Sequence, residues 1–365
     1  IKSRPHPRCG FFLNESSMQV DLLIIGQGLC GSWLSYECQR AGLRVCVIDN
    51  IQPYSPSRIS AGIINPITGR RHVEVWMADD ILPHAAAAYG ELSQSIHQTL
   101  LRKLDLLDFF PAEQMRDSFL DRIRKGGRYV HAYNETAHSP LPLNDPFGIG
   151  RIDPVLLVDL PAFLDGWRKA LIHKQSLREE TFDVDQLILT ESAIQYQDIQ
   201  ADRIIFCDGS YQLANRFFPN LPFAPNKGEV LILDIPYLPT DHLYKHRLML
   251  APLSNGTWWA GSSYQWSFDH AEPTAEFRTS TEQTLRKWLK VPFRVIDHVA
   301  GIRPATLERR PFVGLHPQDQ RLGLFNGMGT KGCSLAPYFA RQLVQHTSNG
   351  SPIHPEAALT RFKLG

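Results

Sequence analysis

Three glycines near the start of the chain have the spacing of a phosphate-binding turn. Gly26, Gly28 and Gly31 fit G-x-G-x-x-G, directly after the apolar run 20–25 and before a helical stretch at 32–41. Glycine at these places permits a tight turn, close approach of a pyrophosphate to the backbone, and close packing of helix on strand. The start of the helix then directs free N–H groups at the phosphates. The pattern predicts a dinucleotide-binding site.

An acidic residue stands where the ribose of such a dinucleotide would lie. Asp49 follows the apolar run 43–48 and comes 18 residues after Gly31. Its carboxylate can accept hydrogen bonds from ribose hydroxyls. Strand, turn, helix, strand and acid together form one βαβ unit of about 30 residues. The glycine pattern alone does not distinguish NAD from FAD.

Charge and composition exclude several classes of partner. The 365 residues suffice for about two domains, and 43% of them are hydrophobic, enough to bury a large core. Lysine and arginine (38) nearly balance aspartate and glutamate (37), so the formal net charge is +1. This balance does not favour DNA or an anionic membrane. No apolar stretch reaches the roughly 18 residues of a membrane span.

The cysteines and the first residues bear on the compartment. Six cysteines are present, with no C-x-x-C pair and no paired Cys/His spacing. Their pattern predicts a reducing cytoplasm and no bound metal. Residues 1–17 are polar, lack the apolar core of a signal peptide and precede Met18. We expect them to be an N-terminal extension, with the domain proper beginning near Met18.

The order of the expected elements predicts an interrupted nucleotide domain. The first βαβ unit stands at the start, a strand, a glycine-rich turn and a helix occupy 322–346, and strand-like segments over 227–270 lie between them. The spacing of apolar residues predicts one long helix over 76–109. The expected fold class is α/β with α+β elements: a Rossmann-like domain with an inserted antiparallel-sheet substrate domain.

Seven further segments carry a family likeness. They are, in chain order, 60–64 (SAGII), 152–154 (IDP), 202–209 (DRIIFCDG), 227–230 (KGEV), 300–306 (AGIRPAT), 311–314 (PFVG) and 327–332 (GMGTKG). Together they resemble the D-amino-acid oxidase (DAO) superfamily of flavoproteins, especially its glycine oxidase and sarcosine oxidase branch. The resemblance covers nearly all of the chain after Met18 and implies FAD as the cofactor.

The resemblance also implies how the chain is divided. The FAD-binding domain would be discontinuous and the substrate domain would fill the gaps, the former over 18–85, 151–222 and 300–365 and the latter over 86–150 and 223–299. Sarcosine oxidases tether FAD through a cysteine near the Arg-Pro position, and the stretch 300–311 contains none. The FAD is therefore expected to be noncovalent, although Cys333 lies close to this stretch in the sequence.

By the same resemblance, cofactor contacts are expected at the pyrophosphate turn, the ribose, the ribityl chain, the adenine and the flavin edge. They are Gly26, Gly28, Leu29, Cys30, Gly31, Asp49, Asn50, Ser57, Ser60, Ala61, Gly62, Ile63, Leu187, Gly209, Gly327, Met328, Gly329, Thr330, Lys331, Gly332, Cys333 and Ser334. The helix at 334–346 would direct its positive end at the flavin edge that gains charge on reduction. Lys331 could add to that charge or be an ordinary surface lysine.

For the substrate, the resemblance points to Arg303 as the anchor of a carboxylate, as a fork-to-fork pair. The alternative is a structural arginine paired with Glu308 or Asp297. Arg70 and Arg71 directly follow the flavin segment, so they either bind a second anionic group of the substrate or lie on the surface. The resemblance also implies a departure: glycine oxidases have a tyrosine at the place of Met249, so a polar lid is either missing or supplied by Tyr264 or Tyr244. His72 as a base is a weaker idea.

The implied reaction is oxidation of the C–N bond of a small amino acid or N-substituted amino acid by hydride transfer from Cα to flavin N5. In such a reaction the protein supplies orientation and electrostatics, so no general base is assigned. The electron acceptor would be oxygen, a quinone or a carrier protein, and a homo-oligomer is allowed. Two alternatives stay open: an FAD enzyme that modifies a tRNA wobble uridine, and a non-catalytic flavin-binding or NAD-binding subunit.

Overall fold

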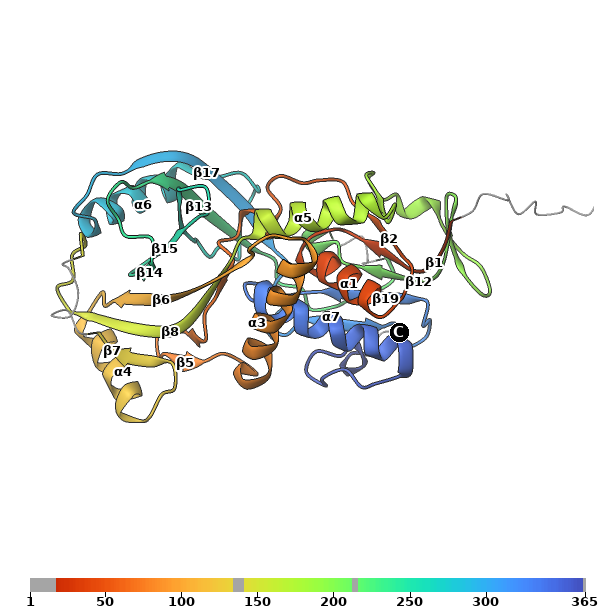
Figure 1. The fold of residues 1–365 in the computed structure, drawn as a ribbon, viewed down its shortest axis with the longest axis horizontal. Helices are drawn as coiled ribbons and strands as arrows, with labels where there is room; N and C mark the ends of the chain where they lie inside the picture. The colour runs from red at the N-terminus through yellow and green to blue at the C-terminus, as the bar shows by residue number, and fades with distance from the viewer. Residues whose placement is uncertain (1–17, 134–140, 212–215, 364–365) are drawn as a thin grey trace, which may run out of the picture.

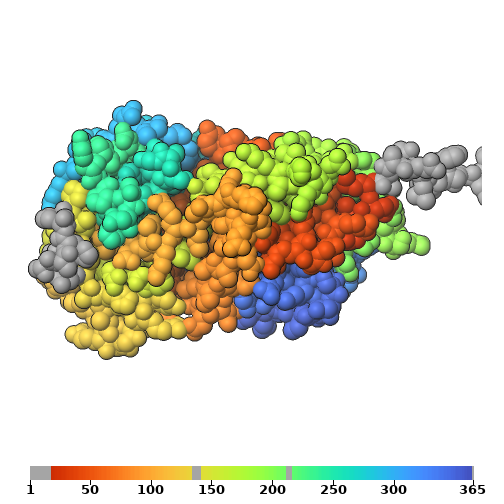
Figure 2. Space-filling model, in the orientation of Figure 1, coloured from red at the N-terminus to blue at the C-terminus, as the bar shows by residue number. Residues whose placement is uncertain are grey.

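Two large sheets lie side by side along the long axis of the molecule (Figure 1). The computed structural model describes residues 18–133, 141–211 and 216–363; the predicted extension 1–17 lies outside the described residues. In Figure 2, segments of the second sheet (yellow, green and cyan) form one end, α1 and α7 (red and blue) lie toward the other, and α3 (Ala78–Ser95, orange) covers the middle. No helix of the described residues is long and apolar enough to cross a membrane.

The first sheet is built on the predicted βαβ unit. Its parallel core has the order β9–β2–β1–β12–β19. These strands are β1 (Met18–Ile25), β2 (Val45–Ile48), β9 (Leu177–Arg178), β12 (Ile199–Phe206) and β19 (Leu322–Asn326). Antiparallel strands extend it at β12 and β19, namely β10 (Leu187–Leu189), β11 (Ile194–Tyr196) and β18 (Phe312–Leu315). Buried strands of this kind read as the continuous apolar runs seen in the sequence.

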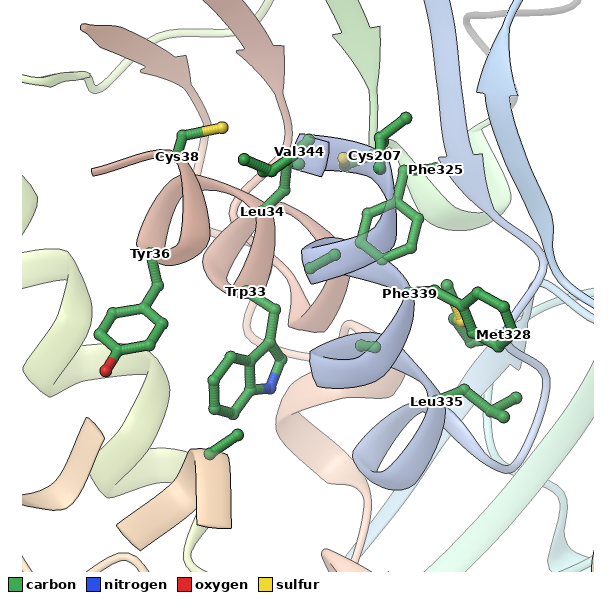
Figure 3. Packing of buried hydrophobic residues seen from close by; sticks show 14 of the residues in the cluster. Trp33, Leu34, Tyr36, Cys38, Cys207, Phe325, Met328, Leu335, Phe339 and Val344 are labelled. Atoms are coloured by element: carbon green, nitrogen blue, oxygen red, sulfur yellow. The ribbon is translucent and has the colours of Figure 1, made fainter. Parts of the chain in front are cut away.

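Helices cover this sheet and close its core. They are α1 (Leu29–Arg40), α5 (Leu160–His173) and α7 (Gly332–Asn349). Trp33 of α1 is fully buried, with its ring 4.9 Å from Tyr89 and 5.3 Å from Phe163. In Figure 3 the labelled side chains of α1 and of α7, including Phe339, belong to the same apolar cluster. This packing fixes the amino ends of both helices near one edge of the sheet.

The second sheet has nine strands and is antiparallel except between β14 and β6. Its strands are β3 (Ile63–Ile64), β6 (Leu101–Phe109), β7 (Val130–Ala132), β8 (Ile149–Val158), β13 (Asn226–Asp234), β14 (His242–Lys245), β15 (Met249–Pro252), β16 (Trp258–Gly261) and β17 (Arg294–Arg303). Helices α4 (Glu113–Arg124) and α6 (Ala275–Trp288) pack on it. Short elements complete the described chain: α2 (Pro56–Ile59), the ribbon β4 (Ile67–Thr68) and β5 (Val73–Glu74), and 3-10 turns at 184–186, 209–211 and 359–361.

The predicted fold class is confirmed, but the helix expected over 76–109 is wrong in its second half. Helix α3 ends at Ser95, and β6 occupies Leu101–Phe109. Leu106 packs into one apolar cluster, whereas Leu107 and Phe109 pack into another. Alternate burial on two faces is what a strand provides, so tertiary packing overrides the helix propensity of this leucine-rich segment.

The division into domains stays a prediction. The expected boundary at 151 falls inside β8, and the expected boundary at 300 falls inside β17. Both strands pair along their length within the second sheet, β8 with β6 and β17 with β13. These two long strands therefore carry the chain from one sheet to the other.

Candidate active site

One cavity of about 1330 Å³ lies between the two sheets. Its walls include the carboxyl ends of β1, β2 and β12 on one side and residues of β13, β15, β16 and β17 on the other. Ligand cavities are usually about 300–1000 Å³. The space therefore suffices for a dinucleotide together with a small second molecule.

The glycine turn forms the end of the cavity at β1. Gly26 has φ +97°, which a residue with a side chain rarely adopts, and a Cβ on Gly31 would lie 1.7 Å from the carbonyl oxygen of Gly26. The turn and α1 can meet this closely only with glycine at both places. The amide of Leu29 donates to Ser57 Oγ at 3.1 Å. The first amides of α1 thus border the cavity, as a pyrophosphate site requires.

Asp49 lines the cavity and already has partners within the chain. Its Oδ1 accepts the amide of Gln27 at 2.8 Å, and its Oδ2 accepts Nη1 of Arg168 at 2.7 Å. Arg168 is buried on α5 and also donates to Glu179. Each carboxylate oxygen has a further lone pair. The hydroxyls of a ribose could therefore donate to Asp49, which the chain already holds in place.

The other end of the dinucleotide space is closed by the loop before α7. Met328, Gly329, Thr330, Lys331, Gly332 and Cys333 all line the cavity. The positive end of α7 faces this loop, and the partly buried Lys331 forms no ion pair with a described residue. Burial lowers the pKa of the Lys331 ammonium to about 8. This donor set suits the anionic edge of a reduced flavin.

The amide of Gly329 in this loop donates to the carbonyl oxygen of Pro304 at 3.1 Å. Pro304 directly follows Arg303, whose guanidinium also lines the cavity. The loop and the arginine are therefore joined through the backbone.

Arg303 is held in the cavity by neutral acceptors. Its Nη1 donates to Asn226 Oδ1 at 2.7 Å and to the Ser263 carbonyl oxygen at 3.2 Å, and its Nη2 donates to Ser262 Oγ at 2.7 Å. A Cβ on Gly228 would lie 1.9 Å from Nη2, so glycine there makes room for the guanidinium. Burial lowers the pKa of Arg303, but a guanidinium remains charged at neutral pH.

The alternative ion pairs considered for Arg303 are not formed. Glu308 pairs with Arg361, and Asp297 Oδ1 accepts the amide of His298. The ring of Tyr264 stacks 4.7 Å from the Arg303 guanidinium carbon. Among the described residues, Arg303 has no carboxylate partner, so the cavity holds a fixed cation facing open space.

Only some of the tyrosine and arginine candidates line the cavity. Tyr264 lines the cavity, whereas Tyr244 is buried outside it and donates its hydroxyl to the carbonyl oxygen of Pro239. Arg70 lines the cavity at an exposed position, but Arg71 does not line it. His72 is fully buried outside the cavity, with Nε2 3.2 Å from Asp108 Oδ2, so it cannot reach a substrate as a base.

Most of the predicted cofactor residues meet in this one cavity. Those that line it are Gly26, Gly28, Leu29, Cys30, Asp49, Asn50, Ser57, Ser60, Ala61, Ile63, Gly209, Met328, Gly329, Thr330, Lys331, Gly332 and Cys333. Those that do not line it are Gly31, Gly62, Leu187, Gly327 and Ser334. On the side where Leu187 was expected, Glu180, Thr181 and Phe182 form the wall instead.

Two features were missed by the sequence reasoning. Arg168 interrupts the apolar face of α5. Because a buried arginine needs an acidic partner, its place in the sequence could have predicted an ion pair. The basic run of Lys245, His246 and Arg247 joins two apolar strands and lines the cavity. Within the described ranges, no three His, Cys, Asp or Glu side chains are grouped as a metal site.

Comparison with known proteins identifies the kind of site. Residues 21–346 match the family model described as FAD dependent oxidoreductase (DAO). The glycine oxidase of Pseudomonas aeruginosa is 25% identical over 362 residues, covering 92% of this chain and 97% of its own.

Solved structures share the fold. Glycine oxidase from Geobacillus kaustophilus superposes with a TM-score of 0.76 at 19% identity, over 95% of this chain and all (100%) of its own. Iminodiacetate oxidase from Chelativorans superposes with a TM-score of 0.74 at 21% identity, over 91% and 96%. The glycine turn, the volume of the cavity and the positive loop before α7 all fit FAD.

Proposed function

The chain belongs to the DAO family of FAD-dependent oxidoreductases, and on this premise we propose that it oxidises the C–N bond of an amino acid or N-substituted amino acid. The substrate carboxylate would bind Arg303. Glycine oxidase and iminodiacetate oxidase, to which the chain is similar, are named for substrates that combine an amino group with a carboxylate. This likeness supports the substrate class, and the cavity itself supplies the argument for the anchor.

The observation that carries the proposal is the unpaired charge of Arg303. Its three described hydrogen-bond acceptors, from Asn226, Ser262 and Ser263, are neutral. A buried cation without an anionic partner is costly to maintain, and a substrate carboxylate would supply that partner through charge-assisted hydrogen bonds. A purely structural arginine would not need to face the cavity.

The chain's own residues account for orientation and shielding. Arg303 would hold the carboxylate, Tyr264 would cover it, and the bare backbone at Gly228 and Gly261 leaves room beside it. Met249 presents an apolar wall at the place where glycine oxidases have a tyrosine. Bound FAD would supply the two-electron acceptor for the hydride. The rate then depends on how precisely these residues align the Cα–H bond.

Several finer expectations belong with this proposal. Burial raises the pKa of the Cys333 thiol to about 12, which disfavours the thiolate that a covalent flavin link needs and supports noncovalent FAD. The described cysteines are free, in keeping with a cytoplasmic protein. The electron acceptor, the oligomeric state and the tRNA alternative remain predictions. The charged, unpaired Arg303 speaks against a non-catalytic subunit.

The test is anaerobic bleaching of the bound flavin. We expect the purified protein to be yellow and to lose its absorbance with one of glycine, sarcosine, N-alkylglycines or D-amino acids. Readmission of oxygen then tells an oxidase from a dehydrogenase by whether the colour returns at once. Amines that lack a carboxylate serve as the matched control and should not react. Equal bleaching by these amines would contradict the proposal.

A further inference from the structure

The side of the second sheet contributes only basic charged residues to the cavity lining, whereas the side of the first sheet contributes both signs. The carboxylates that line the cavity are Asp49, Glu180 and Asp208, all placed after strands of the first sheet. On the side of the second sheet the charged lining residues are Arg303, Lys245 and Arg247, with Arg70 nearby on the loop after β4. The described substrate side of the cavity therefore has basic groups and no acidic lining residue.

Lys245 is built into the wall. Its Nζ lies 2.7 Å from Asp108 Oδ2, and this carboxyl is almost wholly buried, with a side-chain exposure of 2%. The same oxygen of Asp108 lies 3.2 Å from Nε2 of the buried His72. Lys245 itself stays 26% exposed and lines the cavity. A buried partner of this kind fixes the direction of a side chain that is flexible by itself.

Arg247 and Arg70 add charge without an internal partner. Neither pairs with a carboxylate of the described chain, and both are exposed residues of the cavity lining. By contrast Arg58, which also lines the cavity, is paired with Asp165 at 2.8 Å. Arg247 lies two residues from Lys245, and Arg70 lies two residues from His72, which contacts the same carboxyl as Lys245. These three lining residues therefore come from neighbouring segments, and only Lys245 has an acidic partner.

The strand register gives the backbone separation between the strand of Lys245 and the strand over which the Arg303 guanidinium lies. Val230, Gly261, Met249 and Lys245 are paired in one row across β13, β16, β15 and β14, so they share a face of the sheet. The guanidinium of Arg303 lies above Gly228, two residues from Val230 on that face. Three strand spacings separate β13 from β14, or about 14 Å. Gly261, which has no side chain, lies in this row between β13 and β14.

We infer that the substrate is an elongated amino acid with a second anionic group, which binds at Lys245, Arg247 and Arg70 while its α-carboxylate binds Arg303. This inference rests on the proposed function and specifies its substrate class. The second group is a carboxylate or a phosphate, since both pair with lysine and arginine. A chain of several methylene groups must join the two ends, because the two basic sites are far apart along the row.

The test uses glycines whose nitrogen carries an acidic tail. N-carboxyalkyl glycines with one, three and five methylene groups are compared, by anaerobic flavin reduction, with N-alkylglycines of equal length, and a phosphonate-tailed compound distinguishes phosphate from carboxylate. We expect the acidic tail to raise kcat/KM at least tenfold over its neutral counterpart at three to five methylene groups. No advantage at any length, or a maximum at one methylene group, would overturn the inference.

Variants assign the effect to residues. Arg247→Gln, at an exposed position, should reduce the acid-to-neutral ratio of kcat/KM about tenfold. Arg247→Glu should reduce the ratio further and favour a cationic tail. Lys245→Met is expected to act like Arg247→Gln; if it does not fold, Arg247→Gln and Arg70→Gln decide. The control is Arg124→Gln on α4, an exposed arginine outside the cavity lining.

Failure of the inference can be told from failure of the proposed function. If glycine, sarcosine and neutral N-alkylglycines reduce the flavin as well as the acidic compounds do, only the second anionic group is wrong. If no amino acid of either kind reduces it, the proposed function itself fails.

Discussion

The two sheets face the same cavity but prepare it in different ways. On the side of the first sheet, Asp49 is satisfied within the chain by Gln27 and Arg168. On the side of the second sheet, Arg303 has only neutral acceptors. A carboxylate whose charge is already paired can hold a ligand that stays in place. An uncompensated cation gains most when an anionic ligand arrives, as suits a molecule that comes and goes.

The largest expected effect is on the side of the first sheet, at the glycine turn. Gly31→Ala should abolish FAD binding or folding, because the new Cβ would lie 1.7 Å from the carbonyl oxygen of Gly26. Flavin absorbance per protein and the thermal midpoint measure the loss. The matched control is Gly90→Ala in α3, where a Cβ meets nothing within 4 Å. It should keep its flavin and gain about 0.5–1 kcal/mol of stability.

The next largest effect is on the side of the second sheet, at Arg303. Arg303→Ala should raise the KM of the substrate about 30- to 4000-fold, since loss of one partner of a buried charge pair costs about 2–5 kcal/mol. Arg303→Lys should recover only part of the loss, because it lacks the fork geometry. Arg294→Ala at the exposed start of β17 is the control. Unchanged steady-state KM in Arg303→Ala would refute the anchor.

A smaller effect is expected at Lys331, in the loop before α7. With the pKa of Lys331 lowered to about 8, its charge is present at pH 7 and is lost as the pH rises through 8. Lys331→Met should weaken the binding of sulfite to the flavin about tenfold at pH 7, about 1.4 kcal/mol. The difference from the unsubstituted protein should shrink by pH 10. Spectrophotometric titration measures it, and a gap that does not change with pH would contradict this role.

The smallest effect compares two neighbours. Arg70→Gln should raise the KM of an anionic substrate up to about fivefold, because an exposed ion pair contributes about 0–1 kcal/mol. Arg71→Gln should have no effect, since Arg71 does not line the cavity. Adding salt should reduce the effect of Arg70→Gln. Equal effects of the two variants in steady-state kinetics would mean that neither arginine acts through a defined contact.

Local patterns in the sequence predict part of both sides of the cavity. The glycine turn, Asp49 and the loop before α7 lie in local patterns, and the structure brings them to one cavity as expected. Arg303 lies in a short contiguous motif, and the structure places it in the same cavity. These features need only a strand, a turn and a helix in order, which one stretch of chain specifies by itself.

The rest depends on contacts between distant segments. Arg168 meets Asp49 across 119 positions, and Lys245 meets Asp108 across 137. Such pairs follow from strand order and register, which apolar periodicity alone does not set. The error at 101–109 has the same origin, because its strand is specified by burial on both faces rather than by propensity. In this molecule, contacts between distant segments on either side of the cavity are therefore the ones least accessible to sequence reasoning.

The hydrogen bond from the Gly329 amide to the Pro304 carbonyl has a thermodynamic consequence. It ties the loop that would surround the flavin to the residue beside the substrate anchor, so ordering either segment reduces the entropy cost of ordering the other. Linkage then requires reciprocity: whatever factor FAD contributes to substrate affinity, substrate contributes to FAD affinity. The enzyme would retain its cofactor most firmly while it is working, and release it most readily when substrate is scarce.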